Sequence, residues 1–296
     1  MDRYAAHRDF IAPAVPTAAL WRVFVGFLAA SAVYLLLNNL FFTLVFNLLG
    51  SQDGSFYDDL LTGKTPVAMF ILLGSFGLMT VGVVLVARVL HKRSLSSLIG
   101  PMSLAVPQFG MVVRMLVIVG AITFVLPPWG FGEDNVSNMP LGKWVLLLPL
   151  SLVAVFIQVS AEEIVFRGYV QQQLAARFKS PLVWMVLPSV LFALGHYLPE
   201  EAGENAVTIA LWAAVFGILM ADLTARAGSL GPAIAVHFCN NVTAILITSL
   251  PDNLSGLALY VTPFGMKDTE ALRAWLPVDF ALMFVSWLAA RLAIRR

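Results

Sequence analysis

The sequence predicts an all-α integral membrane protein, folded as a bundle of about eight transmembrane helices in one domain over residues 1–296. Hydrophobic residues make up 59% of the chain and charged residues only 12%, whereas soluble domains carry roughly 25% charged residues. The apolar residues gather in eight runs, each near the ~20 residues that cross a bilayer core. The alternating pattern of a β-barrel is not seen, so helices are expected to satisfy the backbone in lipid.

These runs define the expected helices in order along the chain. The first is long and carries Asn38 and Asn39, so we expect it to tilt or to extend past the membrane. The third has Arg114 near its start and Pro127-Pro128 at its end. The fourth leads directly into a cluster of ionisable residues. The expected spans are 21–49, 68–90, 109–127, 143–161, 181–198, 206–226, 229–250 and 276–294.

Charge bias predicts the orientation of the chain, because Lys and Arg are retained on the cytoplasmic side. The first 20 residues mix arginine, aspartate and proline, which is not typical of a cleavable signal peptide. Eight spans place both termini on one side, and that side receives 14 of the 18 Lys and Arg residues. The acidic loops around 53–59, 133–134 and 200–204 fall on the opposite side. We therefore expect an integral protein of a bacterial cytoplasmic membrane, with both termini in the cytoplasm.

Composition also excludes several classes of function. The formal net charge of +1 argues against a nucleic-acid partner. The single cysteine, Cys239, excludes an intrachain disulfide and a cysteine-based zinc cluster.

The most informative segment runs from Glu162 to Gly168 and reads EEIVFRG. Each ionisable group at a helix centre in lipid costs on the order of 2.5–3.5 kcal/mol, so three of them together indicate function. A helical turn of about 100° per residue puts Glu163 and Arg167 on one face, in the favourable order for a supporting ion pair. Glu162 points away from them, and we expect no partner for it nearby in the sequence. Glu162 is therefore the carboxylate more available for chemistry.

Two histidines lie in apolar segments where they can reach these carboxylates. His196 ends the expected span 181–198, and His237 has Asn241 one turn further on the same face. The other two, His7 in the N-terminal tail and His91 in a basic loop, are expected to be solvated. Buried polar groups need partners, and the intramembrane residues are the natural partners for one another.

This set of residues fits the hydrolysis of an amide bond. A carboxylate beside an imidazole can deprotonate water. A further histidine and an asparagine can donate hydrogen bonds to a developing oxyanion. Two histidines and a glutamate also match a hydrolytic zinc site, but the HExxH spacing is absent. We predict no cofactor and leave a divalent metal open.

Three motifs follow one another between residues 142 and 250. They are Glu162-Glu163-x-x-Phe166-Arg167-Gly168 with Leu174, Phe192-x-x-x-His196, and His237-x-x-x-Asn241 preceded by Ser229-Leu230-x-Pro232. Together they resemble the CPBP family, the CAAX proteases and bacteriocin-processing enzymes that are also called Abi-type intramembrane proteases. The resemblance marks residues 142–250 as the core that carries the motifs.

The resemblance implies a glutamate-dependent intramembrane endopeptidase, with its site open to the cytoplasmic side. By that resemblance Glu162 activates a water together with His196, while His237 and Asn241 stabilise the oxyanion. Glu163 and Arg167 would support the site. The implied partners are membrane lipid and a peptide or protein substrate, which is prenylated for the eukaryotic CAAX-cleaving members.

Two other classes of function compete with this interpretation. A non-catalytic membrane scaffold or a bacteriocin self-immunity protein would use the same polar residues only to pack the bundle. A transporter would use Glu and His to relay protons. Against a transporter, the polar residues form one compact set and inverted repeats are not evident.

Overall fold

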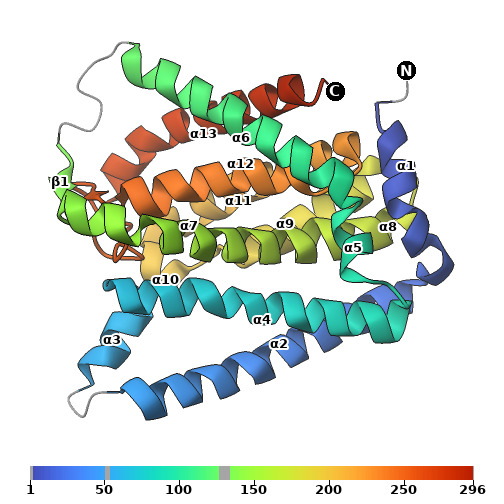
Figure 1. The fold of residues 1–296 in the computed structure, drawn as a ribbon, viewed down its shortest axis with the longest axis horizontal. Helices are drawn as coiled ribbons and strands as arrows, with labels where there is room; N and C mark the ends of the chain where they lie inside the picture. The colour runs from blue at the N-terminus through green and yellow to red at the C-terminus, as the bar shows by residue number, and fades with distance from the viewer. Residues whose placement is uncertain (1–2, 51–53, 127–133, 296) are drawn as a thin grey trace.

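Long helices lie side by side along the long axis of the molecule (Figure 1). A computed structural model describes residues 3–50, 54–126 and 134–295. Its helical elements are α1 (Ala5–Ile11), η1 (Ala12–Thr17), α2 (Leu20–Leu49), α3 (Ser55–Thr62), α4 (Pro66–His91), α5 (Leu95–Ile99), α6 (Met102–Val125), α7 (Leu141–Glu163), η2 (Ile164–Gln171), α8 (Gln172–Arg177), η3 (Leu182–Val186), α9 (Leu187–Leu194), α10 (Pro199–Ala202), η4 (Gly203–Asn205), α11 (Ala206–Ala227), α12 (Gly231–Asn241), η5 (Val242–Ile247) and α13 (Thr269–Ala293).

The predicted all-α membrane fold is confirmed, with changed lengths for some helices. Six helices of the described residues are long and apolar enough to cross a membrane. The fifth and seventh expected spans are instead shorter apolar helices, Leu182–Leu194 and Gly231–Ile247. The six long helices are Leu20–Leu49, Pro66–His91, Met102–Val125, Leu141–Arg177, Pro199–Ala227 and Thr269–Ala293.

The fourth helix continues well beyond its expected end at residue 161. It runs unbroken through α7, η2 and α8 for 37 residues, from Leu141 to Arg177. Hydropathy ends this span too early because the charges of Glu162, Glu163 and Arg167 lower it. The segment η2 is a π-helix, a form that is often found at functional sites.

The third helix begins earlier than expected. It starts at Met102 and not at residue 109, so Arg114 lies in the middle of α6, where it is exposed. The proline pair at 127–128 lies outside the described residues.

Local signals fix where several helices begin and end. The Thr65 side chain accepts from Ala68 N at 3.4 Å, and Pro66 occupies the first position of α4. That helix ends at Lys92, which has a left-handed φ of 55°. Gly228 ends α11 with a φ of 72°, a conformation that glycine adopts without strain.

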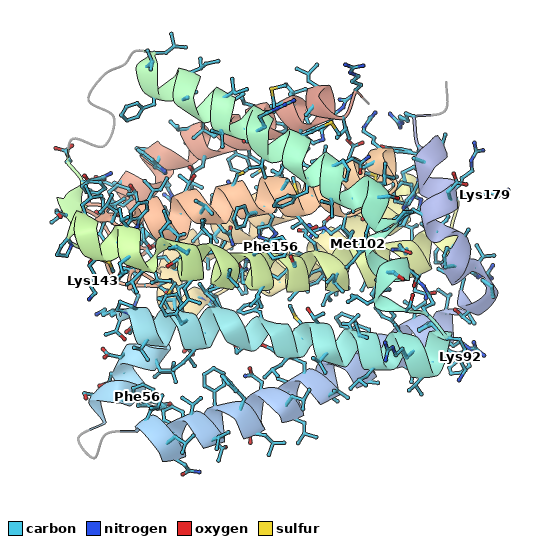
Figure 2. The ribbon with its side chains drawn as sticks, viewed as in Figure 1. Phe56, Lys92, Met102, Lys143, Phe156 and Lys179 are labelled. Carbon is cyan, nitrogen blue, oxygen red and sulfur yellow. The ribbon has the colours of Figure 1, made fainter. Side chains whose placement is uncertain are left out.

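The two ends of the bundle differ in structure and charge. One end, which we call the α1 end, holds α1, α5, α8 and the close of α13 (Figure 1). The other, the α3 end, holds α3, α10 and a small sheet of β1 (Val136–Ser137), β3 (Tyr260–Val261) and β2 (Thr248–Ser249) in that order. β3 pairs antiparallel with β1 and parallel with β2. Figure 2 shows Lys92 and Lys179 at the α1 end and Lys143 at the α3 end. Both ends of the described chain thus lie at the α1 end, as an even number of crossings requires.

Two histidines expected to be solvated are buried instead. His7 is 4% exposed, and its ring centroid lies 4.6 Å from that of Trp184. His91 is 2% exposed, and its Nε2 lies 2.7 Å from the Tyr169 hydroxyl. The expectation failed because α1 and η1 fold back against α8 and α11, a long-range contact that the local sequence does not reveal.

Buried apolar side chains form two main clusters. One is built largely from α4, α7, η2 and α8, and the other from α6, α9, α11, α12 and α13. Phe166 of η2 packs against both clusters. The ionisable motif that contains Phe166 therefore lies at the seam between them.

Candidate active site

Glu163 and Arg167 form the ion pair that their spacing predicts. Arg167 Nη1 lies 3.0 Å from Glu163 Oε1, and both side chains are 0% exposed. Arg167 Nη2 also donates to the Gly217 carbonyl at 3.2 Å, and its guanidinium lies 4.9 Å from the centroid of the Phe192 ring. An unpaired charge at this depth would be strongly destabilising, so these contacts are what allow Arg167 to be buried.

His237 joins the first and third motifs. Its Nδ1 lies 2.9 Å from Glu163 Oε1 and its Nε2 lies 3.4 Å from Glu162 Oε2. The ring stands edge-on to Phe216 at 5.0 Å and to Phe192 at 6.1 Å. Each nitrogen of this imidazole thus faces a different carboxylate, and apolar rings hold it in that orientation.

Gln158 links Glu162 to Asn241, a role that the sequence analysis missed. Its Nε2 donates to Glu162 Oε2 at 2.7 Å, and its Oε1 accepts from Asn241 Nδ2 at 2.8 Å. The expectation that Glu162 has no nearby partner in the sequence is therefore wrong. A signal was present, because Gln158 is a polar residue four positions earlier in an otherwise apolar run.

Asn241 is held by two amides. It donates to Gln158 as described, and Asn240 Nδ2 donates to its Oδ1 at 3.1 Å. The structure therefore brings Asn241 to Glu162 through Gln158. The amide chain fixes the orientation of the Asn241 side chain and leaves its second N–H available.

His196 approaches the same group from the end of α9. Its Nδ1 lies 2.9 Å from the Phe192 carbonyl oxygen. A carbonyl only accepts, so Nδ1 carries the proton and Nε2 of the neutral ring keeps its lone pair. The ring centroid lies 4.4 Å from that of Phe192 with the planes tilted by 44°, and Phe192 also contacts the ring of His237. Among the described residues, no direct hydrogen bond joins His196 to Glu162.

The donor set does not have the arrangement of a metal site. In the described ranges, no three His, Cys, Asp or Glu side chains are placed to hold a metal ion. Both ring nitrogens of His237 face carboxylates, and His196 Nδ1 faces a carbonyl. The residues present thus form a hydrogen-bonded cluster among themselves.

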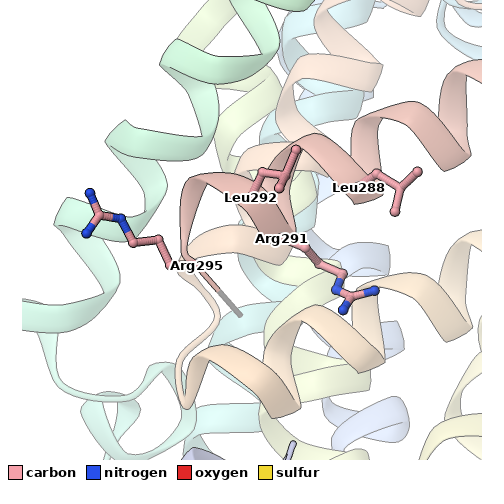
Figure 3. A pocket seen from close by; sticks show the side chains of 4 residues that line it. All are labelled: Leu288, Arg291, Leu292 and Arg295. Atoms are coloured by element: carbon pink, nitrogen blue, oxygen red, sulfur yellow. The ribbon is translucent and has the colours of Figure 1, made fainter.

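The hollow drawn in Figure 3 is separate from this cluster. It is lined by Leu288, Arg291, Leu292 and Arg295, at the C-terminal end of α13. The cluster itself lies deeper in the bundle. Phe156 packs on Phe238, the residue after His237, and Figure 2 shows Phe156 near the middle of the bundle.

Comparisons with known proteins agree with the motifs. A family model described as type II CAAX prenyl endopeptidase, Rce1-like, matches residues 144–243. The chain is also similar to the uncharacterized protein YyaK of Bacillus subtilis (strain 168), with 27% identity over 257 residues that cover 84% of each chain. No solved structure matches the chain at a significant level. The matched residues 144–243 contain the glutamate pair and all three motifs. Over the segment that carries the motifs, the chain therefore matches the Rce1-like CAAX endopeptidases of the CPBP family.

Proposed function

We propose that this protein is an intramembrane endopeptidase in which Glu162 and His196 activate a water that attacks a peptide bond. The observation that carries the proposal is the contact of His237 with both glutamates at 2.9 and 3.4 Å. This contact assembles acid, base and oxyanion-binding groups from separate helices at one buried point. The match of residues 144–243 to a family model of CAAX endopeptidases supports the same chemistry.

The general base is built from two side chains. One oxygen of Glu162, Oε2, accepts from Gln158, so Oε1 is left to accept a proton from water. His196 offers the lone pair of Nε2, because Nδ1 is occupied by the Phe192 carbonyl. A water between these two acceptors is deprotonated as its oxygen bonds to the substrate carbonyl carbon. The proton then passes to the amide nitrogen as the C–N bond breaks.

The oxyanion of the tetrahedral intermediate is bound by His237 and Asn241. Because Nδ1 of His237 faces the Glu163 carboxylate, which accepts only, Nε2 can donate to an oxyanion only when both nitrogens carry protons. Asn241 supplies its free amide N–H as the second donor.

The finer expectations from the sequence form part of this proposal. The catalytic core corresponds to residues 142–250 within one transmembrane domain of residues 1–296. The α1 end, with Lys92 and Lys179, faces the cytoplasm of a bacterial cell. The site opens toward that side, and the substrate is a membrane-bound peptide or protein. The prenylated CAAX peptide named in the family description is the first probe to try.

The test is cleavage of a quenched fluorescent, farnesylated CAAX peptide by purified protein in liposomes. Glu162→Gln is expected to lower kcat by about 10³-fold, because it removes the general base, and to leave the melting temperature unchanged. Glu200→Gln, an exposed glutamate at the α3 end, is the matched control and should keep full activity. Full activity in Glu162→Gln would overturn the mechanism. If the wild-type protein cleaves no peptide and Glu162→Gln only lowers the melting temperature, a non-catalytic scaffold or immunity protein is favoured.

A further inference from the structure

The long helix α2 carries an amide side chain on the side that faces away from the bundle. Figure 1 shows α2 at the edge of the molecule, packed on α4. On the α4 side Ala30 is buried, and a Cβ at Gly82 of α4 would lie 3.0 Å from its carbonyl oxygen. Asn39 follows nine residues later, and at about 100° per residue this is two and a half turns. Asn39 therefore points away from α4, and its side chain is exposed.

The Asn39 amide lies inside the hydrocarbon layer. Helix α2 has 30 residues, so it is about 45 Å long and exceeds the ~30 Å hydrocarbon core by about 7 Å at each end. Asn39 lies ten residues before the end of the helix, so it is about 7 Å inside the layer. Within residues 3–50, 54–126 and 134–295, no hydrogen bond of its amide is found. Lipid offers no partner either, so this position favours a partner from outside the chain.

The exposed side chains around Asn39 repeat with the spacing of a coiled coil. They follow one another in steps of four and three residues, as the a and d positions of a heptad do. When Asn39 is an a position, Val25 is also at a, while Leu28 and Leu35 are at d. A β-branched residue at a with leucine at d favours two parallel strands, and a single asparagine at a fixes their register. We call these exposed residues the α2 seam: Trp21, Val25, Leu28, Ala32, Leu35 and Asn39.

We propose that the α2 seam is the contact between two copies of this chain, which form a parallel dimer about a two-fold axis along the bilayer normal. A carboxamide both donates and accepts, so it is self-complementary. Two copies inserted in the same orientation place their Asn39 side chains at the same depth, where each amide donates to the other. Close packing and interhelical hydrogen bonds are the forces that associate helices in lipid. The two-fold axis then brings each seam residue to its own counterpart.

The proposed interface is separate from the candidate active site. Helix α4 lies between α2 and α7, which carries the glutamate pair (Figure 1). The dimer therefore leaves the hydrogen-bonded cluster of each copy as described. The inference does not depend on the proposed endopeptidase function, and its tests read association and not cleavage.

Disulfide crosslinking in liposomes tests which face of α2 meets the second copy. Leu35→Cys and Leu40→Cys are compared in a Cys239→Ala background, which without a second substitution is the blank. The two leucines are matched in exposure, at 63% and 57%, but at five residues apart they point about 140° away from each other. Leu35→Cys is expected to give at least about fivefold more crosslinked dimer than Leu40→Cys, because a d position faces its counterpart. Equal yields, or a higher yield from Leu40→Cys, would overturn the proposal.

The role of the amide is tested by the strength of association. Energy transfer between copies that carry donor or acceptor fluorophores on a C-terminal tag gives the dissociation constant of the dimer in liposomes. Asn39→Leu is expected to raise this constant by about 5–30-fold, the effect of one interhelical hydrogen bond in model peptides. Asn39→Gln keeps a self-complementary amide and should stay within about threefold of wild type.

A matched control lies on the same helix. Asn47→Leu removes an exposed asparagine outside the α2 seam and should leave the dissociation constant unchanged. Thermal unfolding checks that each variant folds, and the crosslinking comparison decides the case even where Asn39→Leu does not. Absence of energy transfer at every density of wild-type protein shows a monomer and overturns the proposal. A dissociation constant that is the same in Asn39→Leu and wild type does so too, because the amide then has no part in the contact.

Discussion

Glu163 Oε1 lies 2.9 Å from His237 Nδ1, although sequence spacing assigns this carboxylate to Arg167 alone. One oxygen atom therefore serves two cations or donors from two different helices. Glu163 thereby couples the position of His237, the proposed oxyanion donor, to the ion pair with Arg167. A substitution that breaks the Glu163–Arg167 ion pair should therefore lower both the stability of the fold and the activity.

Removal of the Glu163 charge should destabilise the fold strongly. Glu163→Gln leaves the Arg167 guanidinium buried without a counter-charge, which costs about 3–5 kcal/mol. Unfolding in detergent, followed by circular dichroism, measures the loss. Glu204→Gln is the control, because Glu204 pairs with Arg273 at 3.8 Å on an exposed surface and should change little. The double variant Glu163→Leu with Arg167→Met should recover most of the lost stability. Equal losses of stability in Glu163→Gln and Glu204→Gln would contradict this account.

Gln158 should affect turnover more than folding. In Gln158→Leu, Glu162 loses a hydrogen-bond donor and Asn241 loses an acceptor, so the base and the oxyanion donor are both less well oriented. We expect kcat to fall about 10-fold, the size of one or two hydrogen bonds. Ser151→Ala on the same helix is the control, since Ser151 Oγ bonds only to the Leu147 carbonyl in the described structure. A kcat equal to wild type in Gln158→Leu would remove Gln158 from the site.

The start of α12 should tolerate no added methyl group. A Cβ at Gly231 would overlap the Ala105 carbonyl oxygen of α6, and backbone atoms cannot move aside cheaply. Gly231→Ala is therefore expected to cost about 1–3 kcal/mol and to lower activity, because His237 follows on the same helix. At Gly120 of α6 a Cβ meets nothing within 4 Å. Gly120→Ala should leave stability unchanged or raise it by up to about 1 kcal/mol. A lower melting temperature for Gly120→Ala than for Gly231→Ala would contradict the packing of α6 on α12.

Acid should weaken the docking of α1 through His7. Burial lowers the pKa of His7 from 6.5 to about 4. Between those two values the unfolded chain binds a proton and the folded chain does not, so the free energy of unfolding falls as the pH falls. The full loss from pH 7 to pH 4 is about 3 kcal/mol. His7→Phe should flatten this part of the curve of stability against pH. An unchanged slope in that variant would show that other groups titrate instead.

Much of the fold follows from the sequence, because hydropathy marks each apolar segment. All eight expected segments are helices, and the basic residues Lys92 and Lys179 lie together at one end as their loop positions indicate. The predicted lengths of the helices were less accurate. The fourth span seemed to end at 161 because its charges resemble a membrane boundary, although pairing of Glu163 with Arg167 keeps them inside.

The site was predictable only as far as local spacing reaches. The pairing of Glu163 and Arg167 lies within one helix turn and was expected. The contact of Glu163 with His237 joins residues 74 positions apart, so only the packing of α12 on α7 reveals it. Gln158 could have been found from its spacing to Glu162, but an isolated amide in an apolar run carries no sign of its partner.

The shortness of the helix that precedes His196 has a consequence for the surrounding bilayer. Leu182–Leu194 spans about 20 Å, whereas the hydrocarbon core is about 30 Å thick. Its outer face is exposed, with Leu182 at 74% and Leu194 at 63%. The lipid beside it must thin by about 10 Å, or water must descend by about that distance below the headgroup region. In the proposed mechanism, this local hydrophobic mismatch gives water a route to the imidazole of His196, and membrane thickness becomes a determinant of how readily the site is hydrated.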